Sequence, residues 1–286
     1  MTPSLADDFA GRSFVKMSGG GNDFVVFDNR DDWFPKERAP GIIARLCRRG
    51  LGVGADAVLL LERDGEADVR MAYYNADGGE APMCGNGALC IARYARMEGA
   101  VEGDTLRLAT GSGTFRARVP DPEKAEVTLW LVPPRDLALR HLELEKPPYR
   151  RVGFVDTSTP HVVALVDDVE GVDLQREGPS FRRDSRWDPP GANANFVSVL
   201  DRHTVRMRTY ERGVEDETLS CGTGATASAI LTTLWGLTES PVTVRTTGGI
   251  PLIVDFTRPL DPEALPADPR LTGDARVIFR GSLDEV

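Results

Sequence analysis

The chain lacks long hydrophobic runs and an excess of basic residues. None of its 286 residues belongs to a run near the ~18 consecutive apolar residues of a membrane span, and residues 1–8 lack the basic and apolar segments of a secretory leader. Acidic side chains outnumber basic ones by 44 to 34, which gives a net charge of −10. Nucleic-acid binding requires a basic face that displaces counterions. We therefore expect a cytoplasmic protein without a membrane or nucleic-acid partner.

Cysteine is also scarce, and its spacing excludes the usual cysteine frameworks. The four residues are Cys47, Cys84, Cys90 and Cys221, with no C-x-x-C pair among them. This spacing fits neither a zinc site nor a disulfide scaffold. The chain also lacks a strand–G-x-G-x-x-G–helix fingerprint and an obvious pyridoxal-phosphate signature. We therefore expect no metal and no cofactor.

The chain does contain an internal repeat. The pattern C-G-x-G-A occurs at residues 84–88 and again at residues 221–225, an offset of 137. Without gaps, the same offset brings further segments into register: residues 25–26 with 162–163, 54–57 with 191–194, Tyr73 with Tyr210, Glu80 with Glu217, and 110–111 with 247–248. Matches that share one register over about a hundred residues indicate an internal duplication.

The local patterns predict the same elements in both halves. Apolar runs at 24–27, 57–61, 162–166 and 196–199 predict buried strands, and shorter β patterns occur at 114–119, 252–254 and 275–280. Apolar helical stretches follow each C-G-x-G-A motif, at 88–97 and 225–235, and the segments around 146–148 and 188–190 predict connectors. We expect an α/β (α+β) fold of two pseudo-symmetric domains, each a curled, mostly antiparallel sheet around a central helix. The active site is expected in the cleft between them.

A cysteine that precedes a helix has a distinct chemistry. It lies among unpaired backbone N–H groups at the positive end of the helix dipole, which lowers a thiol pKa and creates an anion site. Two such cysteines, related by the duplication, suggest a thiol on each side of a bound carboxylate. Inversion of a stereocentre requires that a proton is removed from one face and that a proton is returned to the opposite face, and two such groups do this directly.

The sequence resembles the diaminopimelate epimerases from about Phe14 to Arg280. The resemblance rests on the ordered segments Gly21-Asn22-Asp23-Phe24, Tyr74-Asn75-Ala76-Asp77-Gly78, Met83-Cys84-Gly85-Asn86-Gly87-Ala88, Pro160-His161, Glu211-Arg212-Gly213 and Cys221-Gly222-Thr223-Gly224. It implies a cofactor-independent isomerase that converts LL-diaminopimelate to meso-diaminopimelate in lysine and peptidoglycan-precursor biosynthesis. It also implies a homodimer in which the last strand returns to the first domain, so that the domains span 1–135 plus 272–286 and 136–271.

The resemblance further implies a role for individual residues. Cys84 and Cys221 would be the acid and base, and His161 and Glu211 would tune the ionisation of the thiols. The other substrate-binding residues would be Asn22, Asn75, Gly85, Asn86, Thr159, Asn193, Arg212, Gly222 and Thr223, and Glu211 would also contact the substrate. Arg212 is a natural partner for the distal carboxylate. Cys47 and Cys90 are expected to be core thiols.

Two alternatives remain open. The chain has Ser158-Thr159 where the family usually has glycine and asparagine, which leaves room for a racemase of another amino acid, such as histidine. The second alternative is a redox or non-catalytic protein in which Cys84 and Cys221 form a reversible disulfide.

Overall fold

The computed structural model describes residues 9, 11–139, 149–257 and 264–283, which form two compact units. The first unit contains the described residues up to Leu129 and those from Gly273 onward, and the second contains Trp130–Thr272. The predicted domains, 1–135 with 272–286 and 136–271, place the first boundary six residues later and the second one residue earlier than these units do.

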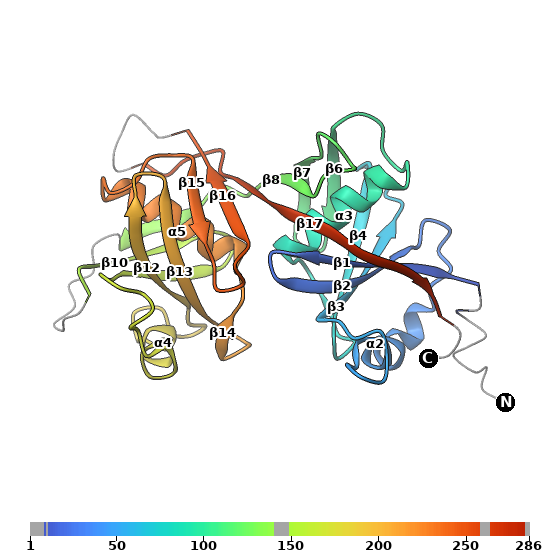
Figure 1. Cartoon of the computed structure of the whole chain (residues 1–286), viewed down its shortest axis with the longest axis horizontal. Helices are drawn as coiled ribbons and strands as arrows, with labels where there is room; N and C mark the ends of the chain where they lie inside the picture. Colours follow the sequence, from blue (N-terminus) through green and yellow to red (C-terminus); the bar gives the residue numbers. More distant parts are fainter. Residues whose placement is uncertain (1–8, 10, 140–148, 258–263, 284–286) are drawn as a thin grey trace. The chain divides into compact units, whose positions relative to one another are not determined.

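The first unit is a closed ring of strands around one helix (Figure 1). Antiparallel pairs join β1 to β2, β3 to β4, β6 to β7, β7 to β8 and β1 to β17, whereas β2–β3 and β4–β6 are parallel. A pairing between β8 and β17 closes the ring. Helix α3 (Gly85–Met97) contacts strands around this ring and buries ten consecutive residues. The strands are β1 (Ser13–Gly19), β2 (Asn22–Asp28), β3 (Ala57–Glu62), β4 (Val69–Asn75), β5 (Glu80–Ala81), β6 (Thr105–Thr110), β7 (Gly113–Arg118), β8 (Glu126–Trp130) and the later part of β17 (Arg270–Ser282).

The second unit repeats this plan around helix α5 (Gly222–Leu234). Its pairings β10–β11, β11–β12, β12–β13, β13–β14, β13–β15 and β15–β16 have the same sequence of directions as their counterparts from β1 to β7. Both ends of α5 lie 137 residues after the ends of α3. The strands are β9 (Arg135–Leu139), β10 (Arg151–Asp156), β11 (Pro160–Leu165), β12 (Asn193–Asp201), β13 (Thr204–Glu211), β14 (Asp216–Thr218), β15 (Val242–Arg245), β16 (Pro251–Asp255) and the start of β17. The predicted duplication and fold class are confirmed.

Several strands are buried on both faces, which explains their unbroken apolar runs. In β11, Val163 and Leu165 pack with α5, whereas Val162 and Ala164 pack in a separate cluster with α4 (Leu174–Arg182). The first unit has an equivalent outer cluster on α2 (Ala39–Cys47), which follows the short 3₁₀ helix η1 (Lys36–Arg38). With a side-chain period of two, successive apolar residues of such a strand therefore pack alternately into one of two cores.

The offset of 137 between the two units does not hold in every strand, as the side of the strand on which each residue lies shows. In the outer clusters, Val58, Leu60 and Tyr74 of the first unit correspond to Ala194, Phe196 and Tyr210 of the second, an offset of 136. Helices α3 and α5 and strands β2 and β11 keep the offset of 137. A shift of one residue reverses the face of a strand, so the counterpart of Asn75 is Glu211 rather than Arg212.

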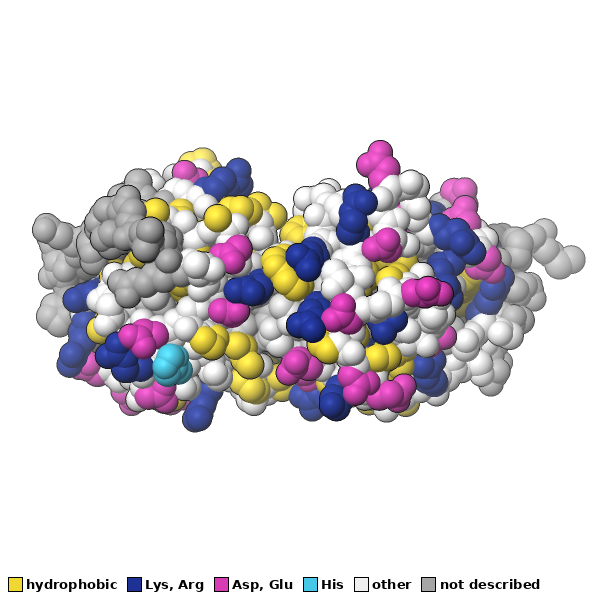
Figure 2. All heavy atoms as spheres, turned by 90° about the horizontal axis from the view of Figure 1, so that it is seen from above, with side chains coloured by type: hydrophobic (Ala, Val, Ile, Leu, Met, Phe, Trp, Pro, Cys, Tyr) yellow, Lys and Arg dark blue, Asp and Glu magenta, His cyan; other side chains and the backbone are white. Residues whose placement is uncertain are grey.

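The predicted strands and helices are present, with changes at their ends. Both helices begin three residues earlier than predicted, because the glycines after Cys84 and Cys221 form the first helical turn rather than a preceding loop. Residues 188–190 form a turn, whereas the predicted connector at 146–148 lies outside the described residues. Within the described ranges, no helix is long and apolar enough to cross a membrane. On the face drawn in Figure 2, basic and acidic side chains are intermingled.

Candidate active site

Each of the two motif cysteines is the residue that precedes a central helix. Cys84 and Cys221 have extended backbones, with φ and ψ of −139° and 124° and of −137° and 108°. Their carbonyl oxygens accept the first helical hydrogen bonds, from Ala88 and Ala225, at 2.8 Å in both cases. The next backbone N–H groups are therefore the donors at a helix N-terminus. The sequence prediction of two equivalent helix starts is correct.

Cys221 lies in a hydrogen-bonded setting at the start of α5. Its side chain is mostly buried, and Gly224 N donates to its sulfur at 3.4 Å. The Thr223 hydroxyl oxygen lies 3.5 Å from the same sulfur. A Cβ at position 224 would lie 2.4 Å from Asn195 Oδ1 and 3.3 Å from the sulfur. Only glycine allows the helix start to approach β12 this closely.

His161 connects Thr223 to the strands behind it. His161 Nε2 lies 2.9 Å from the Thr223 hydroxyl oxygen, and His161 Nδ1 lies 3.0 Å from Asn195 Nδ2. The His161 side chain shares the α5-facing side of β11 with Val163, and Asn195 shares that side of β12 with Val197. Burial, assisted by the positive charge of Arg212, lowers the pKa of His161 to about 3. His161 is therefore a neutral imidazole at physiological pH.

The segment before β11 touches the same helix start. Thr157 donates its hydroxyl hydrogen to the backbone oxygen of Thr223 at 2.9 Å, and its N–H donates to Thr159 O at 3.1 Å. Ser158 between them has a φ of +76°. The partly exposed Thr159 thus belongs to a tight turn anchored to the α5 N-terminus.

Glu211 and Arg212 lie where β13 ends. The Arg212 N–H donates to Asn193 Oδ1 at 2.7 Å, and Arg212 Nη1 donates to Gly191 O at 3.1 Å. Glu211 accepts a hydrogen bond from the Thr218 hydroxyl at 2.8 Å. Burial raises the pKa of Glu211, and the Thr218 bond only partly opposes this effect. The second unit therefore brings Asn193, Glu211 and Arg212 together where β12 begins and the antiparallel strand β13 ends.

In the first unit, asparagine side chains take a comparable place. Asn86 Nδ2 donates to Asn22 Oδ1 at 2.9 Å, and Asn22 Nδ2 donates to Asp56 Oδ2 at 3.0 Å. Gly20 has a φ of +56°, and a Cβ there would lie 2.4 Å from Asn86 Oδ1. The turn between β1 and β2 therefore lies directly against the start of α3. Asn75 is exposed at the end of β4, where its backbone bonds to Gly78 and Gly79.

A charged network that the sequence analysis missed holds Asn22 in place. Lys16 is buried and lies 2.7 Å from the Asp23 carboxylate, and Arg49 donates to both Asp23 and Asp56. Burial raises the pKa of Asp23, but hydrogen bonds and charge from Arg49 and Lys16 outweigh that effect and lower it to about 2. The sequence signal for this network was a lysine, Lys16, between the apolar residues Val15 and Met17 of a buried strand.

The other two cysteines are core thiols. Cys47 is buried at the end of α2 and Cys90 is buried within α3. Burial raises the pKa of Cys47 to about 11 and that of Cys90 well above its ordinary value. Both are therefore poor nucleophiles.

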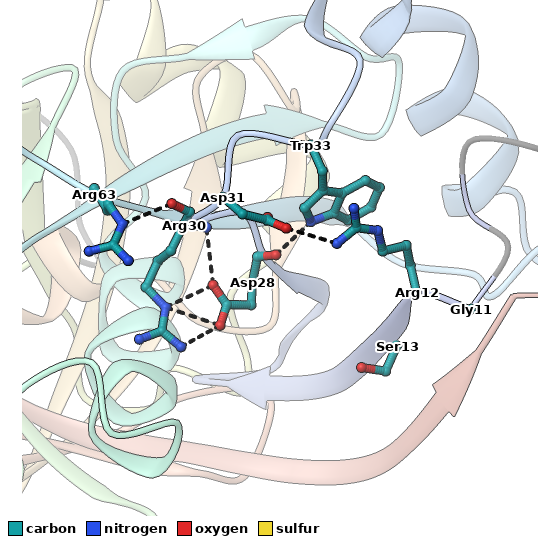
Figure 3. Close-up of a pocket in the computed structure, with 8 residues that line it drawn as sticks. All are labelled: Gly11, Arg12, Ser13, Asp28, Arg30, Asp31, Trp33 and Arg63. Atoms are coloured by element: carbon teal, nitrogen blue, oxygen red, sulfur yellow. Dashed lines mark hydrogen bonds and ion pairs between the residues drawn. The ribbon is translucent and has the colours of Figure 1, made fainter.

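The first unit also has a hollow of about 460 Å³ (Figure 3), and none of the candidate site residues lines it. In this hollow, Arg30 Nε donates to both carboxylate oxygens of Asp28 at 2.9–3.0 Å. Arg12 donates to the Asp31 carboxylate at 3.0 Å and lies over the ring of Trp33. These two cations therefore already have acidic partners. The lining residues are Gly11, Arg12, Ser13, Asp28, Arg30, Asp31, Trp33 and Arg63.

Comparison with known proteins identifies the family. The model of the diaminopimelate epimerase family matches residues 14–130 and 153–256. The chain belongs to the diaminopimelate epimerase family. The diaminopimelate epimerase of Gemmatimonas aurantiaca is 40% identical over 277 residues, which cover 95% of this chain and 99% of that protein. That of Aquifex aeolicus is 39% identical over 281 residues, with 95% and 98% covered.

Solved structures of more distant proteins share the fold. A phenazine biosynthesis protein of the PhzF family from Bacillus anthracis has a TM-score of 0.69 at 15% identity, covering 95% of this chain and 98% of that one. A probable proline racemase from Agrobacterium radiobacter K84 has a TM-score of 0.65 at 17% identity, with 95% and 92% covered. The family member described here therefore has the two-unit architecture of these proteins.

Proposed function

We propose that this protein is an isomerase that epimerises LL-diaminopimelate to meso-diaminopimelate without a cofactor, in lysine and peptidoglycan-precursor biosynthesis. Membership in the family and relatives of that name at 39–40% identity support the reaction. The observation that carries the mechanism is the pair of cysteines, each placed directly before a buried central helix.

Cys84 and Cys221 act as two bases on opposite faces of the substrate Cα. The thiolate of one removes the Cα proton and becomes a thiol, and the electron pair of the broken C–H bond passes to the α-carboxylate. The thiol of the other delivers its proton to the opposite face and becomes a thiolate. No electron enters or leaves, so the reaction needs no redox partner.

The backbone N–H groups at the two helix starts stabilise the charge that develops. Gly85 and Asn86 in one domain, and Gly222 and Thr223 in the other, present donors where a helix dipole is positive. Donors fixed in place before the reaction are a large source of transition-state stabilisation. The α-carboxylate therefore binds at these helix starts.

The remaining candidate residues hold the substrate and tune the thiols. Arg212 binds the distal carboxylate, with its backbone fixed by Asn193. Asn22, Asn75 and Thr159 contribute polar contacts, as does Asn193. His161, which is neutral, and Glu211, whose pKa is raised, influence which thiol is ionised.

We also propose that the enzyme acts in the cytoplasm as a homodimer on a small amino-acid substrate. The mechanism requires both catalytic cysteines in the reduced state, one as a thiolate and the other as a thiol, and reducing compartments keep cysteines reduced. The homodimer rests on the family resemblance, and sedimentation at several protein concentrations measures it.

Deuterium uptake at the substrate Cα tests the mechanism. In deuterated buffer, the wild type should epimerise diaminopimelate and incorporate solvent deuterium. Cys84→Ser and Cys221→Ser should each lose epimerisation by orders of magnitude, because a serine hydroxyl is a far weaker acid than a thiol. Their residual Cα exchange should favour opposite stereoisomers. Cys47→Ser and Cys90→Ser are the matched controls and should stay near wild type.

Other results would point elsewhere. Full epimerisation by Cys221→Ser in both directions would refute the two-base mechanism. Exchange with another amino acid, such as histidine, and none with diaminopimelate would indicate a different racemase. Absence of any Cα exchange together with a reversible Cys84–Cys221 disulfide would indicate a redox protein.

A further inference from the structure

A chain of hydrogen bonds runs from a backbone carbonyl inside the second unit to the Cys221 sulfur. Asn195 Nδ2 donates to Val162 O at 3.0 Å and lies 3.0 Å from His161 Nδ1. His161 Nε2 then lies 2.9 Å from the Thr223 hydroxyl oxygen, which lies 3.5 Å from the sulfur. Every link from Val162 to Cys221 is therefore within hydrogen-bonding distance.

The Val162 carbonyl sets the direction of the first links. A carbonyl oxygen can only accept, so the Asn195 atom that faces it must be the NH₂ group. The opposite end agrees, because the Thr209 hydroxyl donates to Asn195 Oδ1 at 2.9 Å. Since the same NH₂ group faces His161 Nδ1, that nitrogen must accept, and the single proton of the neutral imidazole lies on Nε2.

The Nε2 proton sets the direction of the remaining links. It is directed at the Thr223 hydroxyl oxygen, so the hydroxyl's own hydrogen cannot be used on His161. The Cys221 sulfur is the next atom within reach of that hydrogen. The oxygen also keeps a second lone pair, which can accept from the sulfur when Cys221 is protonated. One hydroxyl can thus serve both protonation states of the thiol.

We propose that Asn195 is a positioning residue that holds His161 in its Nε2–H tautomer and so commits the Thr223 hydroxyl hydrogen to the Cys221 thiolate. The tautomer is a property of the folded chain alone. Its catalytic consequence rests on the proposed function, in which Cys221 is one of the two bases.

This arrangement is confined to one of the two halves. The counterparts of His161 and Thr223 in the first unit, at the offset of 137, are Phe24 and Asn86. The counterpart of Asn195, at the offset of 136 that the strand faces require, is Leu59. A Cβ at Gly87 would approach Leu59, as a Cβ at Gly224 would approach Asn195. The two thiols therefore have different surroundings despite the duplication.

The charged groups around the imidazole favour the neutral state on which the tautomer depends. Arg212, at the end of β13, opposes protonation of His161, and burial within the strands opposes it more strongly. Cys221 faces it only across Thr223. A carboxylate at position 195 would replace the donor beside Nδ1 by an acceptor, so that the single proton of the neutral imidazole would move from Nε2 to Nδ1.

Nitrogen-15 NMR of the histidine rings tests the tautomer directly. The chain has three histidines, and the signals of His161 are those absent from His161→Gln. In the wild type at pH 7.5, Nε2 should show the shift of a protonated nitrogen and Nδ1 that of an unprotonated one. In Asn195→Asp, the proton should appear on Nδ1. In the matched control Thr209→Val, which removes the other Asn195 side-chain bond, the proton should stay on Nε2.

Kinetics on the same proteins test the consequence. In Asn195→Asp, kcat should fall roughly 10- to 100-fold, the effect of losing one hydrogen bond to a charged group, while KM changes little. The limb of the pH profile that reports the Cys221 thiolate should move to higher pH. Asn195→Ala should show a smaller change in the same direction.

Two outcomes would overturn the proposal. One is a proton on Nδ1 in an active wild type, and the other is an Asn195→Asp variant with the proton moved but with an unchanged kcat and pH profile. A wild type with the Nε2–H tautomer and no Cα exchange on any amino acid would instead contradict the proposed function and leave the tautomer standing.

Discussion

Replacement of the buried His161 should remove one specific part of the protein's pH-dependent stability. The folded state holds this histidine neutral, with its pKa lowered from 6.5 to about 3. In the unfolded chain the same side chain binds a proton near pH 6.5. Because the folded pKa is the lower one, the unfolded state gains protons as the pH falls through 6.5, and stability is lost between pH 6.5 and 3.

The size of this effect follows from the two pKa values. At pH 5 the folded histidine is still neutral, so the loss is set by the unfolded chain, about 1.5 pH units below its midpoint. At 1.36 kcal/mol per unit, the free energy of unfolding should fall by about 2 kcal/mol between pH 7.5 and pH 5 through His161 alone. Glu211 acts in the opposite direction, since burial raises its pKa, but it does so in wild type and variants alike.

Urea unfolding at pH 7.5 and pH 5 measures this increment. The wild type and His203→Gln, which alters an exposed histidine, should both contain the loss of about 2 kcal/mol. His161→Gln should be less stable than the wild type at pH 7.5, because it loses hydrogen bonds, but its loss of stability between pH 7.5 and pH 5 should be smaller by about 2 kcal/mol. An equal pH-dependent loss in His161→Gln and the wild type would refute the argument that His161 is folded in its neutral state.

Two other predictions concern packing and charge. Gly224→Ala should lower stability by about 1–3 kcal/mol in thermal unfolding, because its Cβ would overlap Asn195. Gly85→Ala should not lower stability, because nothing lies within 4 Å of the added carbon. Equal shifts of the melting temperature in the two variants would contradict the close approach of Gly224 to Asn195. Lys16→Met should cost about 1.5–3 kcal/mol in urea unfolding, because it removes the buried cation from the Asp23 carboxylate and leaves only the exposed Arg49 as its charged partner. Lys124→Met, whose side chain is 78% exposed, should cost less than about 1 kcal/mol. Equal losses in the two variants would show that the buried pair adds nothing.

The duplication and the helix starts could be read from the sequence because they depend on local order. C-G-x-G-A at two positions predicts two equivalent helices near the two cysteines, and α3 and α5 do begin there, at Gly85 and Gly222, three residues before the predicted helical stretches. The ungapped offset failed inside the strands, where sequence identity cannot tell which face a residue takes. The ungapped offset matched Asn75 with Arg212, although the residue that takes the same inward-facing position as Asn75 in the second unit is Glu211.

The contacts around the thiols depended on strand register, which a sequence alone does not give. Asn195 lies opposite Thr209 on a neighbouring antiparallel strand and beside β11, which is parallel to its own strand. Its polar side chain at an inward position of a buried strand was a usable signal, since Val197 marks that face. The partners of Lys16 likewise come from other segments, Asp23 from the neighbouring strand β2 and the backbone oxygen of Gly54 from the stretch between α2 and β3.

The path of β17 has a consequence for synthesis. This strand begins in the second unit and ends in the first, where it pairs with β1 and with β8. Residues 273–282 are translated only after the whole second unit. Until they emerge, the ring around α3 has a gap between β1 and β8, with two open strand edges and part of its core uncovered. The half that is translated first is therefore completed last, and a nascent chain of this protein must keep an unfinished barrel from pairing with other chains for as long as the second unit takes to be synthesised.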